Sequence, residues 1–508
     1  MKPFRIACCQ VEAHDLEDAE ENLGNLLRAL DEAGEAGAQL VLLPECSYPA
    51  YYLKDREPYA RPGVRPFAEV TALFAEKARR YGYWLAAGMA VPHEDGSLTN
   101  SGVVFAPGGS IAGRYDKGFL WHFDSNWFSP GREFPVWDAG FAKFGILICA
   151  DGRLPEIARM LKVNGAEVIL DLTAWVSSGR TMADLNTTQC EYLMPTRAFE
   201  NGVWVAAADK WGTEDGTIVY AGRSCVIDPS GSARAAAPST GDLVLTYDIV
   251  PMDAELIQRR PALYGPLTRG AREMPSDGQV SGRVSVVPGS GGLDMASVIA
   301  RYRGLRAQGC DFAVFGGVEG PEGWEVDLPP LEAAVRDLGG AAMVAVRTTG
   351  CNWWQAAALV TPGRTYSHTA THGRGIDTGE SLSDIVALPI GNVGMMVGDE
   401  GYVPEVGRCL ALQGADILAW SLFEDGPMAE RVTRTRSDES RVYTALAGPD
   451  RAIVTNPDGG VVASSPAGSG VAMTATTQLA FSRWKERAPG TDVFRDRIPE
   501  AYGRLLRR

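Results

Sequence analysis

A carboxylate, an ammonium and a thiol stand at the ends of three strand-like segments early in the chain. Glu45 ends the apolar run AQLVLLPE, Lys117 follows SIAGRYD, and Cys149 follows FGILI. In layered α/β sheets, ligands gather at the carboxyl ends of the strands. There a thiolate can attack a carbonyl carbon, a carboxylate can carry the proton, and an ammonium with a backbone N–H, that of Ala150, can hold the oxyanion. Together the three groups predict cleavage of an amide.

The segment around Cys149 predicts how the thiol is positioned. Phe144 to Ile148 is continuously apolar, which is typical of a strand buried on both faces. Residues 154–162 then repeat apolar side chains at helical spacing. A thiol in such a strand-to-helix turn lies near backbone N–H groups and the positive end of a helix dipole, which favour the thiolate. The alternatives are an inert buried cysteine and, for Lys117, a solvated turn residue.

Length and charge narrow the class of protein. The chain has 508 residues, too many for one hydrophobic core, so we expect at least two domains. The net charge of −15 argues against nucleic acid or an anionic membrane surface as a partner, because both require clustered Lys and Arg. The amino-terminal segment lacks the pattern of a signal peptide, and no apolar run reaches the ~18 residues of a membrane span. We therefore expect a cytoplasmic protein.

Cysteine and histidine usage gives no sign of a metal site or cofactor. The nine cysteines are odd in number and form no CxxC pair, a pattern that fits free thiols in a reducing compartment. The five histidines have no spacing typical of metal ligands. The sequence thus predicts an enzyme without metal or cofactor.

The chain repeats itself after a segment of linker composition. The matching segments are DFAVFGGVEG (311–320) with AQLVLLPEC (38–46), GRTYSHTATHG (363–373) with GRYDKGFLW (113–121), GNVGMMVGDEG (391–401) with AKFGILICADG (142–152), QGADILAWSLFE (413–424) with NGAEVILDLTAW (164–175), and IPEAYGRLL (498–506) with RPALYGPLT (260–268). A repeat of this length indicates two copies of one fold. We expect domains at 1–270 and 283–508, joined by a linker at 271–282.

The two copies differ at the positions of chemical interest. The alignment of motifs sets Glu319 against Glu45, His368 against Lys117, and Gly398 against Cys149. Without a thiol the second copy has no nucleophile to form an acyl-enzyme, so we expect it to be catalytically inactive. Its polar residues can form a vestigial pocket or bind a ligand; the alternative is that they are ordinary turn residues.

Residues 1 to about 270 resemble the nitrilase superfamily of carbon–nitrogen hydrolases. The resemblance rests on LLPECSYP, GRYDKGFLW, GILICADGRLPE, TRAFENGVWVAAADKWG, GRSCVIDPSG and RRPALYG, which agree in order and spacing. It implies a four-layer αββα sandwich, and with the repeat an α/β protein of two tandem sandwiches. It also implies Cys149 as nucleophile, Glu45 as base and Lys117 as oxyanion lysine. Asp124 in HFDSNWFSPG is the nearest match to a second acid that many members have.

The residues after the cysteine separate branches of this family. Nitrile-cleaving members usually have Trp-Glu there, whereas this chain has Asp151, Arg153, Pro155 and Glu156, which resembles amidases and N-carbamoyl amino acid hydrolases. By that resemblance Arg153 holds a substrate carboxylate through a bidentate fork. A structural pair with Glu156 or Asp151 is the alternative.

The sequence leaves the substrate open. Tyr52, Trp121 and Trp175 belong to a set of aromatic residues that can line a pocket, although aromatic residues also serve packing. We expect a hydrolase of a small amide, ureido or carbamoyl compound that releases ammonia through a thioester. The alternatives are transfer of the acyl group or amide nitrogen, nitrile hydrolysis, and a non-catalytic binding protein. Family members pair face to face, so the second copy is expected to act as an intramolecular partner, with further homo-oligomers left open.

Overall fold

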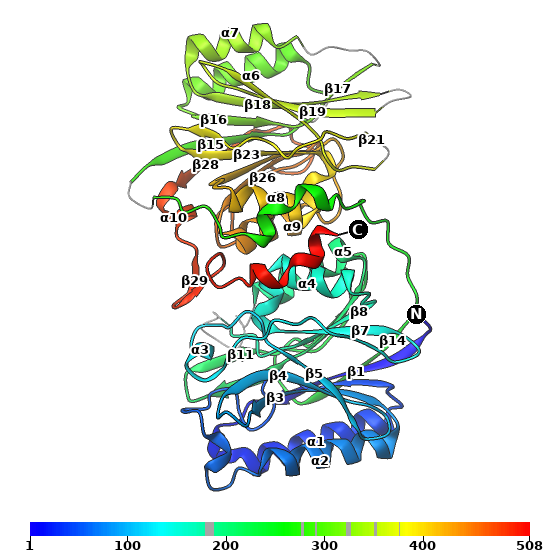
Figure 1. The fold of residues 1–508 in the computed structure, drawn as a ribbon. Helices are drawn as coiled ribbons and strands as arrows, with labels where there is room; N and C mark the ends of the chain where they lie inside the picture. The colour runs from blue at the N-terminus through cyan, green and yellow to red at the C-terminus, as the bar shows by residue number, and fades with distance from the viewer. Residues whose placement is uncertain are drawn as a thin grey trace. The chain divides into compact units, whose positions relative to one another are not determined.

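The chain forms two compact units, each an α/β fold (Figure 1). The computed structural model describes residues 1–177, 187–275, 279–289, 292–321, 327–349, 353–374 and 376–507. Unit 1 comprises Met1–Leu256, Ala488–Thr491 and Asp496–Arg504, and unit 2 comprises Ile257–Arg487, Asp492–Arg495 and Leu505–Arg508.

Unit 1 contains two sheets. The first has the order β11-β10-β1-β2-β3-β4-β5, with β14 also paired to β1. Its strands are β1 (Phe4–Glu12), β2 (Leu40–Leu42), β3 (Trp84–Pro92), β4 (Leu98–Phe105), β5 (Ile111–Asp116), β10 (Lys210–Glu214), β11 (Ile218–Ala221) and β14 (Leu243–Ile249). The second has the order β13-β12-β9-β8-β7-β6. Its strands are β6 (Val136–Asp138), β7 (Lys143–Ile148), β8 (Val168–Leu172), β9 (Trp204–Ala208), β12 (Cys225–Ile227) and β13 (Ala233–Ala236).

Helices cover both sheets of unit 1 and complete four layers. Helices α1 (Ala19–Glu35) and α2 (Phe67–Tyr81) cover the first sheet, and α4 (Pro155–Val163) and α5 (Met194–Asn201) cover the second (Figure 1). The spacing of Leu23, Leu26 and Leu30 gives α1 one apolar face, and all three are buried. Strands β7, β8 and β9 are parallel neighbours, so their carboxyl ends meet at one edge of the second sheet.

Unit 2 has its own pair of sheets with helices. The first has the order β20-β19-β18-β16-β15-β28, with β17 and β21 paired to β18 and β19. Its strands are β15 (Ser281–Val287), β16 (Phe312–Phe315), β17 (Val318–Pro321), β18 (Ala341–Thr349), β19 (Trp353–Val360), β20 (Thr365–Thr369), β21 (Ile376–Asp377) and β28 (Met473–Gln478). The second has the order β22-β23-β24-β25-β26-β27. Its strands are β22 (Val386–Leu388), β23 (Gly391–Val397), β24 (Ile417–Ser421), β25 (Tyr443–Ala447), β26 (Ala452–Thr455) and β27 (Val461–Ser464).

The helices of unit 2 also lie against both of its sheets. Helices α6 (Met295–Ala307) and α7 (Pro329–Leu338) pack on the first, while α8 (Pro404–Leu412) and α9 (Ala429–Ser440) pack on the second. Short elements follow, namely α10 (Leu479–Arg483), β29 (Glu486–Ala488) and β30 (Thr491–Asp492). Both units therefore have the architecture αββα, as expected for the fold class.

The boundary between the units differs from the expected one. Residues from Ile257 onward, expected in the first domain, belong to unit 2. There Arg259 Nε donates to Glu405 Oε1 at 2.8 Å, and the Tyr264 hydroxyl is hydrogen-bonded to His372 Nε2 at 2.8 Å. These buried polar contacts fix the segment on unit 2, because a polar group taken out of water needs a partner.

Conversely, some residues expected in the second domain belong to unit 1. Asp496–Arg504 belongs to unit 1, where Arg497 Nε donates to Glu156 Oε1 at 3.0 Å. The expected linker is also partly structured, since Arg272 N donates to Leu412 O at 2.9 Å and strand β15 begins at Ser281. Linker residues 276–278 lie outside the described part of the chain.

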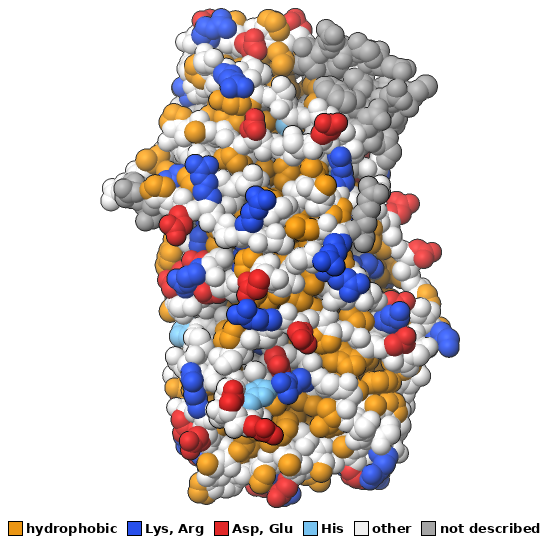
Figure 2. All heavy atoms as spheres, in the orientation of Figure 1, with side chains coloured by type: hydrophobic (Ala, Val, Ile, Leu, Met, Phe, Trp, Pro, Cys, Tyr) orange, Lys and Arg blue, Asp and Glu red, His pale blue; other side chains and the backbone are white. Residues whose placement is uncertain are grey.

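The surface carries both signs of charge. Figure 2 shows acidic and basic side chains interspersed over the face in view, with apolar side chains between them. On that face the described residues do not gather into the basic stripe that marks a nucleic-acid site. Within the described ranges, no helix has both the length and the apolar character needed to span a membrane.

Candidate active site

Lys117 lies directly after β5 and is held by two carboxylates. Its Nζ donates to Glu45 Oε1 at 2.7 Å and to Asp124 Oδ2 at 2.6 Å, and all three side chains are fully buried. Burial acts to lower the pKa of Lys117, but the charges of Asp124 and Glu45 outweigh it and hold that pKa well above its usual range. Lys117 is therefore a fixed positive charge.

Glu45 follows β2 and has one oxygen occupied. Oε1 accepts from Asn100 Nδ2 at 2.7 Å as well as from Lys117, whereas Oε2 is buried and has no hydrogen-bond partner among the described residues. Burial raises the pKa of Glu45, and the neighbouring Lys117 charge opposes the rise. A carboxylate with a raised pKa and an unoccupied oxygen is suited to accept a proton.

Cys149 occupies the strained turn between β7 and α4. Its φ of 49° lies in the left-handed region, which non-glycine residues adopt where the surroundings fix the backbone. Its N–H donates to Asp171 Oδ1 at 2.9 Å, and Sγ lies 3.7 Å from Ala174 O. Burial, followed by the Glu45 charge, raises the pKa of Cys149 well above its usual range, with Lys117 opposing. This direction favours the neutral thiol, whereas the strand-to-helix turn was expected to favour the thiolate.

Asp151 joins the turn at Cys149 to the loop after Lys117. Its Oδ1 accepts from the backbone N–H groups of Gly118 (3.1 Å) and Phe119 (2.7 Å). Its Oδ2 accepts from Ile148 N at 2.9 Å and from the Tyr115 hydroxyl at 2.8 Å. Burial raises the pKa of Asp151 to about 6. This carboxylate fixes two chain segments relative to each other.

Asp124, expected as a second acid, begins the short helix α3 (Asp124–Trp127). Besides Lys117, its Oδ2 accepts from Trp121 N at 2.9 Å and its Oδ1 accepts from the Tyr51 hydroxyl at 2.7 Å. Asp124 therefore anchors Lys117 and α3, and a role in proton transfer stays a prediction.

The aromatic residues expected near the site have three different surroundings. Tyr52 packs edge-on against Phe123 and Trp127, with ring centroids 5.5 and 5.0 Å away. Trp121 is half-buried, and the Arg153 guanidinium lies 4.7 Å from its ring centroid. Trp175 is fully buried.

Arg153 and Ala150, both expected to contact substrate, are buried in the turn after Cys149. Arg153 stacks on Trp121, so its side chain is already directed by that ring, while its carbonyl accepts from Arg197 Nη2 at 3.0 Å. Ala150 is the second residue of the 3₁₀ turn Cys149–Arg153. The structure therefore brings the expected residues of unit 1 into one region.

Several residues of the region carry no motif by which the sequence could reveal them. Asn100 holds Glu45, Asp171 accepts from the Cys149 amide, and Gln189 donates to Cys149 O at 2.8 Å and accepts from Trp175 Nε1 at 3.0 Å in the orientation that satisfies its amide. Burial raises the pKa of Asp171 well above its usual range. The one available signal was a polar residue within an apolar strand, as at Asn100 and Asp171.

The expected match of His368 to Lys117 is wrong. Lys117 N donates to Asn100 O at 2.8 Å, and in unit 2 the same inter-strand bond runs from Ala370 N to Gln355 O at 2.9 Å. Strand register therefore gives Ala370 the place of Lys117. Ala370 lies two positions after His368, and a comparison of motifs alone cannot detect that offset.

His368 instead has the place of Tyr115. Its Nε2 lies 2.9 Å from Glu400 Oε2, as the Tyr115 hydroxyl lies 2.8 Å from Asp151 Oδ2. Glu400 also accepts from Val397 N at 2.9 Å, which repeats a bond of Asp151. His368 is thus a partner of the turn carboxylate.

The match of Glu319 to Glu45 is also wrong. Glu45 N donates to the carbonyl of Thr173, the residue after β8, at 3.3 Å. In unit 2 the residue that donates to Leu422 O, after β24, is Gly317, at 3.1 Å. The Glu319 side chain is 50% exposed and pairs with Arg347. Gly317 therefore occupies the place of Glu45.

Gly398 does stand where Cys149 stands, and the space beside it is filled. It has φ 55°, against 49° at Cys149, and also follows the last residue of a central strand. A Cβ at Gly398 would lie 2.0 Å from Gln355 Oε1, and one at Gly317 would lie 2.2 Å from the ring of Phe423. At these three described positions unit 2 thus has no thiol, carboxylate or ammonium, and two of the positions have no room for a larger side chain.

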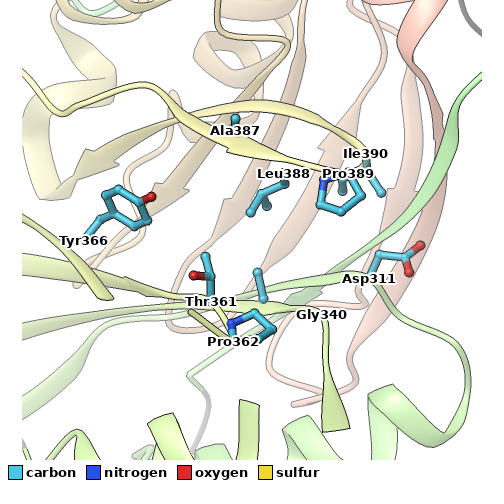
Figure 3. Close-up of a pocket in the computed structure, with 10 residues that line it drawn as sticks. Asp311, Gly340, Thr361, Pro362, Tyr366, Ala387, Leu388, Pro389 and Ile390 are labelled. Atoms are coloured by element: carbon cyan, nitrogen blue, oxygen red, sulfur yellow. The ribbon is translucent and has the colours of Figure 1, made fainter. Parts of the chain in front are cut away.

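Unit 2 has a cavity of about 250 Å³ away from these positions (Figure 3). It opens between the turns β19–β20 and β22–β23, whereas Gln355 and Gly398 lie at the other ends of β19 and β23. Its lining residues include Asp311, Gly340, Thr361, Pro362, Tyr366 and Leu388. The cavity is therefore separate from the counterpart of the Cys149 region. Among described residues, no group of three or more His, Cys, Asp or Glu is arranged to hold a metal ion.

Comparison with known proteins identifies the class. The family named carbon–nitrogen hydrolase matches residues 5–259, a segment that contains Glu45, Lys117 and Cys149. The chain therefore belongs to the carbon–nitrogen hydrolase family, and its membership rests on unit 1.

Relatives with names of several activities match the same segment. A nitrilase of Pyrococcus abyssi is 34% identical over 48% of this chain and 89% of the relative. The omega-amidase NIT2 of Xenopus tropicalis is 31% identical over 49% and 89%, and a citrullinase of Francisella tularensis is 29% identical over 53% and 99%. Among solved structures, an amidase from Nesterenkonia sp. has a TM-score of 0.44 at 27% identity, covering 49% of this chain and 90% of that one. The three sequence relatives thus carry names of three different activities, nitrilase, omega-amidase and citrullinase.

Proposed function

We propose that unit 1 hydrolyses a small amide or N-carbamoyl compound through a thioester on Cys149 and releases ammonia. The observation that carries the proposal is the fully buried Lys117, bonded at 2.7 and 2.6 Å to Glu45 and Asp124. Burying these charges is costly, and catalytic use of a fixed cation beside a thiol and a base explains why such a cluster is present.

In the first step the Cys149 sulfur attacks the carbonyl carbon of the substrate. Glu45 takes the thiol proton on its unoccupied Oε2 and passes it to the leaving nitrogen. Lys117 stabilises the negative charge that develops on the carbonyl oxygen. The C–N bond breaks, ammonia leaves, and an S-acyl or S-carbamoyl thioester remains.

In the second step a water molecule attacks the thioester. Glu45 removes a proton from that water, and the C–S bond breaks to give an acid and the free Cys149 thiol. An N-carbamoyl substrate gives a carbamic acid, and an amide gives a carboxylic acid. Two alternatives remain for this thioester. An amine instead of water could attack it, which would make the protein a transferase, or the substrate from which it forms could be a nitrile.

The substrate class is supported by the residues after Cys149 and by the relatives. Asp151, Arg153 and Glu156 match the amidase and carbamoylase pattern of the family. Relatives named omega-amidase and citrullinase are matched by this chain over 89% and 99% of their own length. Arg153, fixed on Trp121, is proposed to bind a substrate carboxylate through its guanidinium.

We also propose that unit 2 is a degenerate copy without acyl chemistry. Gly317, Ala370 and Gly398 hold the places of base, lysine and nucleophile, and none of them can transfer a proton or form a thioester. The repeated strand order and the repeated hydrogen bonds support a common origin of the two units.

The test is intact-protein mass spectrometry with an ammonia assay. Wild type and Cys149→Ala are incubated with a panel of primary amides, N-carbamoyl amino acids and nitriles. We expect an acyl adduct and ammonia release from wild type alone, and the responding compound gives the substrate class. Addition of hydroxylamine distinguishes transfer, which would yield a hydroxamate in place of the acid.

Cys409→Ala is the matched control, because Cys409 is a buried cysteine of unit 2. It should retain wild-type activity. Ammonia release that survives Cys149→Ala would contradict the proposal.

A further inference from the structure

Two short stretches of unit 1 lie far along the chain from the rest of the unit. We call Ala488–Thr491 and Asp496–Arg504 the closing segment; all of Ile257–Arg487 separates it from Leu256. Because the closing segment packs on unit 1, its contacts show what it contributes there. They fall on the two chain segments that carry Cys149 and Lys117.

The first contact is a buried ion pair at the start of α4. Arg497 Nε donates to Glu156 Oε1 at 3.0 Å, and the two side chains are 0% and 1% exposed. Glu156 is the second residue of α4, and α4 follows directly on the turn Cys149–Arg153. The position of this helix end therefore sets the position of the Cys149 turn.

The second group of contacts is on the loop after Lys117. Ile498 Cδ1 lies 3.4 Å from where a Cβ of Gly118 would be, directly beside Lys117. His122 N donates to Thr491 Oγ1 at 2.6 Å, and the rings of Phe134 and Tyr502 lie 6.1 Å apart. The closing segment thus contacts the chain segment that carries Cys149 and the one that carries Lys117. The Asp151 carboxylate joins the same two segments through buried hydrogen bonds.

We propose that the closing segment is a positioning element of the active site, and that Arg497 is the residue that holds the Cys149 turn in its reactive geometry. The inference rests on the proposed role of Cys149. Arg497 does not touch the reacting atoms; it acts through Glu156 and α4. Catalysis by unit 1 would then depend on residues that follow Ile257–Arg487, the main part of unit 2, in the chain.

The physical basis is the cost of leaving Glu156 without its guanidinium. A buried carboxylate that loses its cation forces the surroundings to move or to admit water. The first turn of α4 is the part that can move, and it is continuous with the turn in which Cys149 is held at φ 49°. A displacement there changes the distance from the sulfur to the base and to the lysine.

Unit 2 provides a matched pair. Arg259 Nε donates to Glu405 Oε1 at 2.8 Å, and Glu405 is the second residue of α8. The same ion pair is therefore present beside Gly398, where there is no reactive group. Loss of this pair removes comparable packing without any effect on a nucleophile.

The experiment compares full-length wild type, R497Q, R497K and R259Q. Alkylation of Cys149 by iodoacetamide is followed at the peptide level across a pH series, and kcat and KM are measured on the best substrate of the panel. We expect R497Q to slow both Cys149 alkylation and kcat by about 10²-fold, the loss typical of a 1 Å misplacement, with little change in KM. R497K should recover part of the rate because it restores the charge without the fork.

The alkylation arm needs no substrate, so failure of the proposed reaction and failure of the positioning role are distinguishable. Unchanged alkylation and kcat in R497Q would overturn the inference. Equal slowing by R259Q would also overturn it, because the effect would then be general destabilisation. If R497Q does not fold, R497K carries the test, because it keeps the charge and loses the fork; alkylation of Cys149 at the wild-type rate in R497K would then overturn the inference.

Discussion

The turn at Cys149 and the turn at Gly398 have nearly the same backbone conformation but differ in their side chains. Both have positive φ, and in both a buried carboxylate, Asp151 or Glu400, accepts the backbone N–H at the end of the preceding strand. Yet only the turn of unit 1 carries a thiol. The backbone geometry of the turn is therefore a property of the fold, and the chemistry is a separate property of a few side chains.

A second shared feature supports this distinction. Arg197 donates to Gly152 O and Glu200, and Arg436 donates to Gly401 O and Glu439, with all four charged side chains fully buried. An ion pair that occurs in both units, with and without a nucleophile, is part of the support of the turn. Lys117 with its two carboxylates has no such counterpart, since Ala370 stands in its place.

The largest effect is expected from Lys117→Ala, which makes unit 1 resemble unit 2 at this position. Loss of the charge that is proposed to stabilise the oxyanion should lower kcat by about 10²–10³-fold. Two buried carboxylates would lose their common cation, so the free energy of unfolding should fall by about 3–5 kcal/mol. Steady-state kinetics and urea unfolding measure the two effects.

Lys485→Ala is the control for this prediction. Lys485 is a half-buried lysine of unit 2 whose Nζ donates to the carbonyls of Ser440, Arg441 and Ser482. Its loss should lower stability and leave kcat unchanged. An equal loss of kcat in both variants would show that stability alone limits the rate.

A smaller effect is expected from Gly398→Cys, which returns a thiol to unit 2. The Cβ would lie 2.0 Å from Gln355 Oε1 at a backbone φ of 55°, so we expect a loss of about 1–3 kcal/mol of stability. In a Cys149→Ala background it should restore no hydrolysis, because Gly317 and Ala370 provide neither base nor lysine.

The double variant Gly398→Cys/Gln355→Ala tests the origin of that loss. Removal of the Gln355 side chain relieves the contact, so the double variant should be less destabilised than the sum of the single changes. Additive losses would contradict the steric explanation. Hydrolysis regained by Gly398→Cys would contradict the proposed degeneracy of unit 2.

The smallest effect concerns the pH dependence of unit 2. Burial opposes the charge of His368, but Glu400 raises the pKa of His368 overall, and His368 in turn helps to lower the pKa of Glu400 despite its burial. The stabilisation by His368 is complete below its unfolded pKa and is lost as pH rises through its raised folded pKa. Unit 2 should therefore be less stable at a pH above this raised pKa than at about pH 6, by no more than about 1.5–3 kcal/mol for one hydrogen bond to a charged group.

His368→Tyr sharpens this comparison because it copies Tyr115 of unit 1. Urea unfolding at both pH values should show a smaller difference in the variant than in wild type. A difference of the same size would mean that another group titrates.

The sequence predicted unit 1 well where local pattern decides structure. The apolar run Phe144–Ile148 lies in β7, and the expected helix from 154 to 162 is α4, Pro155–Val163. The family followed from the resemblance of motifs such as LLPECSYP and GILICADGRLPE, and the fold class followed from that resemblance. The meeting of Glu45 and Lys117 also followed, since both end strands of one sheet.

What the sequence missed depends on contacts between distant segments. His368 and Glu319 were misplaced because strand register, which sets Ala370 and Gly317 in position, is fixed by neighbouring strands and not by the strand itself. Arg259 was expected in the first domain and belongs to unit 2, and Arg497 was expected in the second and belongs to unit 1. Packing between distant segments decides these positions as well. Buried polar contacts of this kind do not change the spacing of apolar residues along the chain, so that spacing cannot reveal them.

The separation of the closing segment from the rest of unit 1 has a consequence for synthesis. A ribosome adds about 5–20 residues per second, and domains fold as they emerge. Met1–Leu256 is complete before Ile257–Arg487 has been made, so unit 1 waits roughly ten seconds to most of a minute for Arg497. During that interval Glu156 has no Arg497 beside it. If Arg497 has the proposed positioning role, unit 1 of the nascent chain would thus work about 10²-fold more slowly until Arg497 has been made and has packed on it.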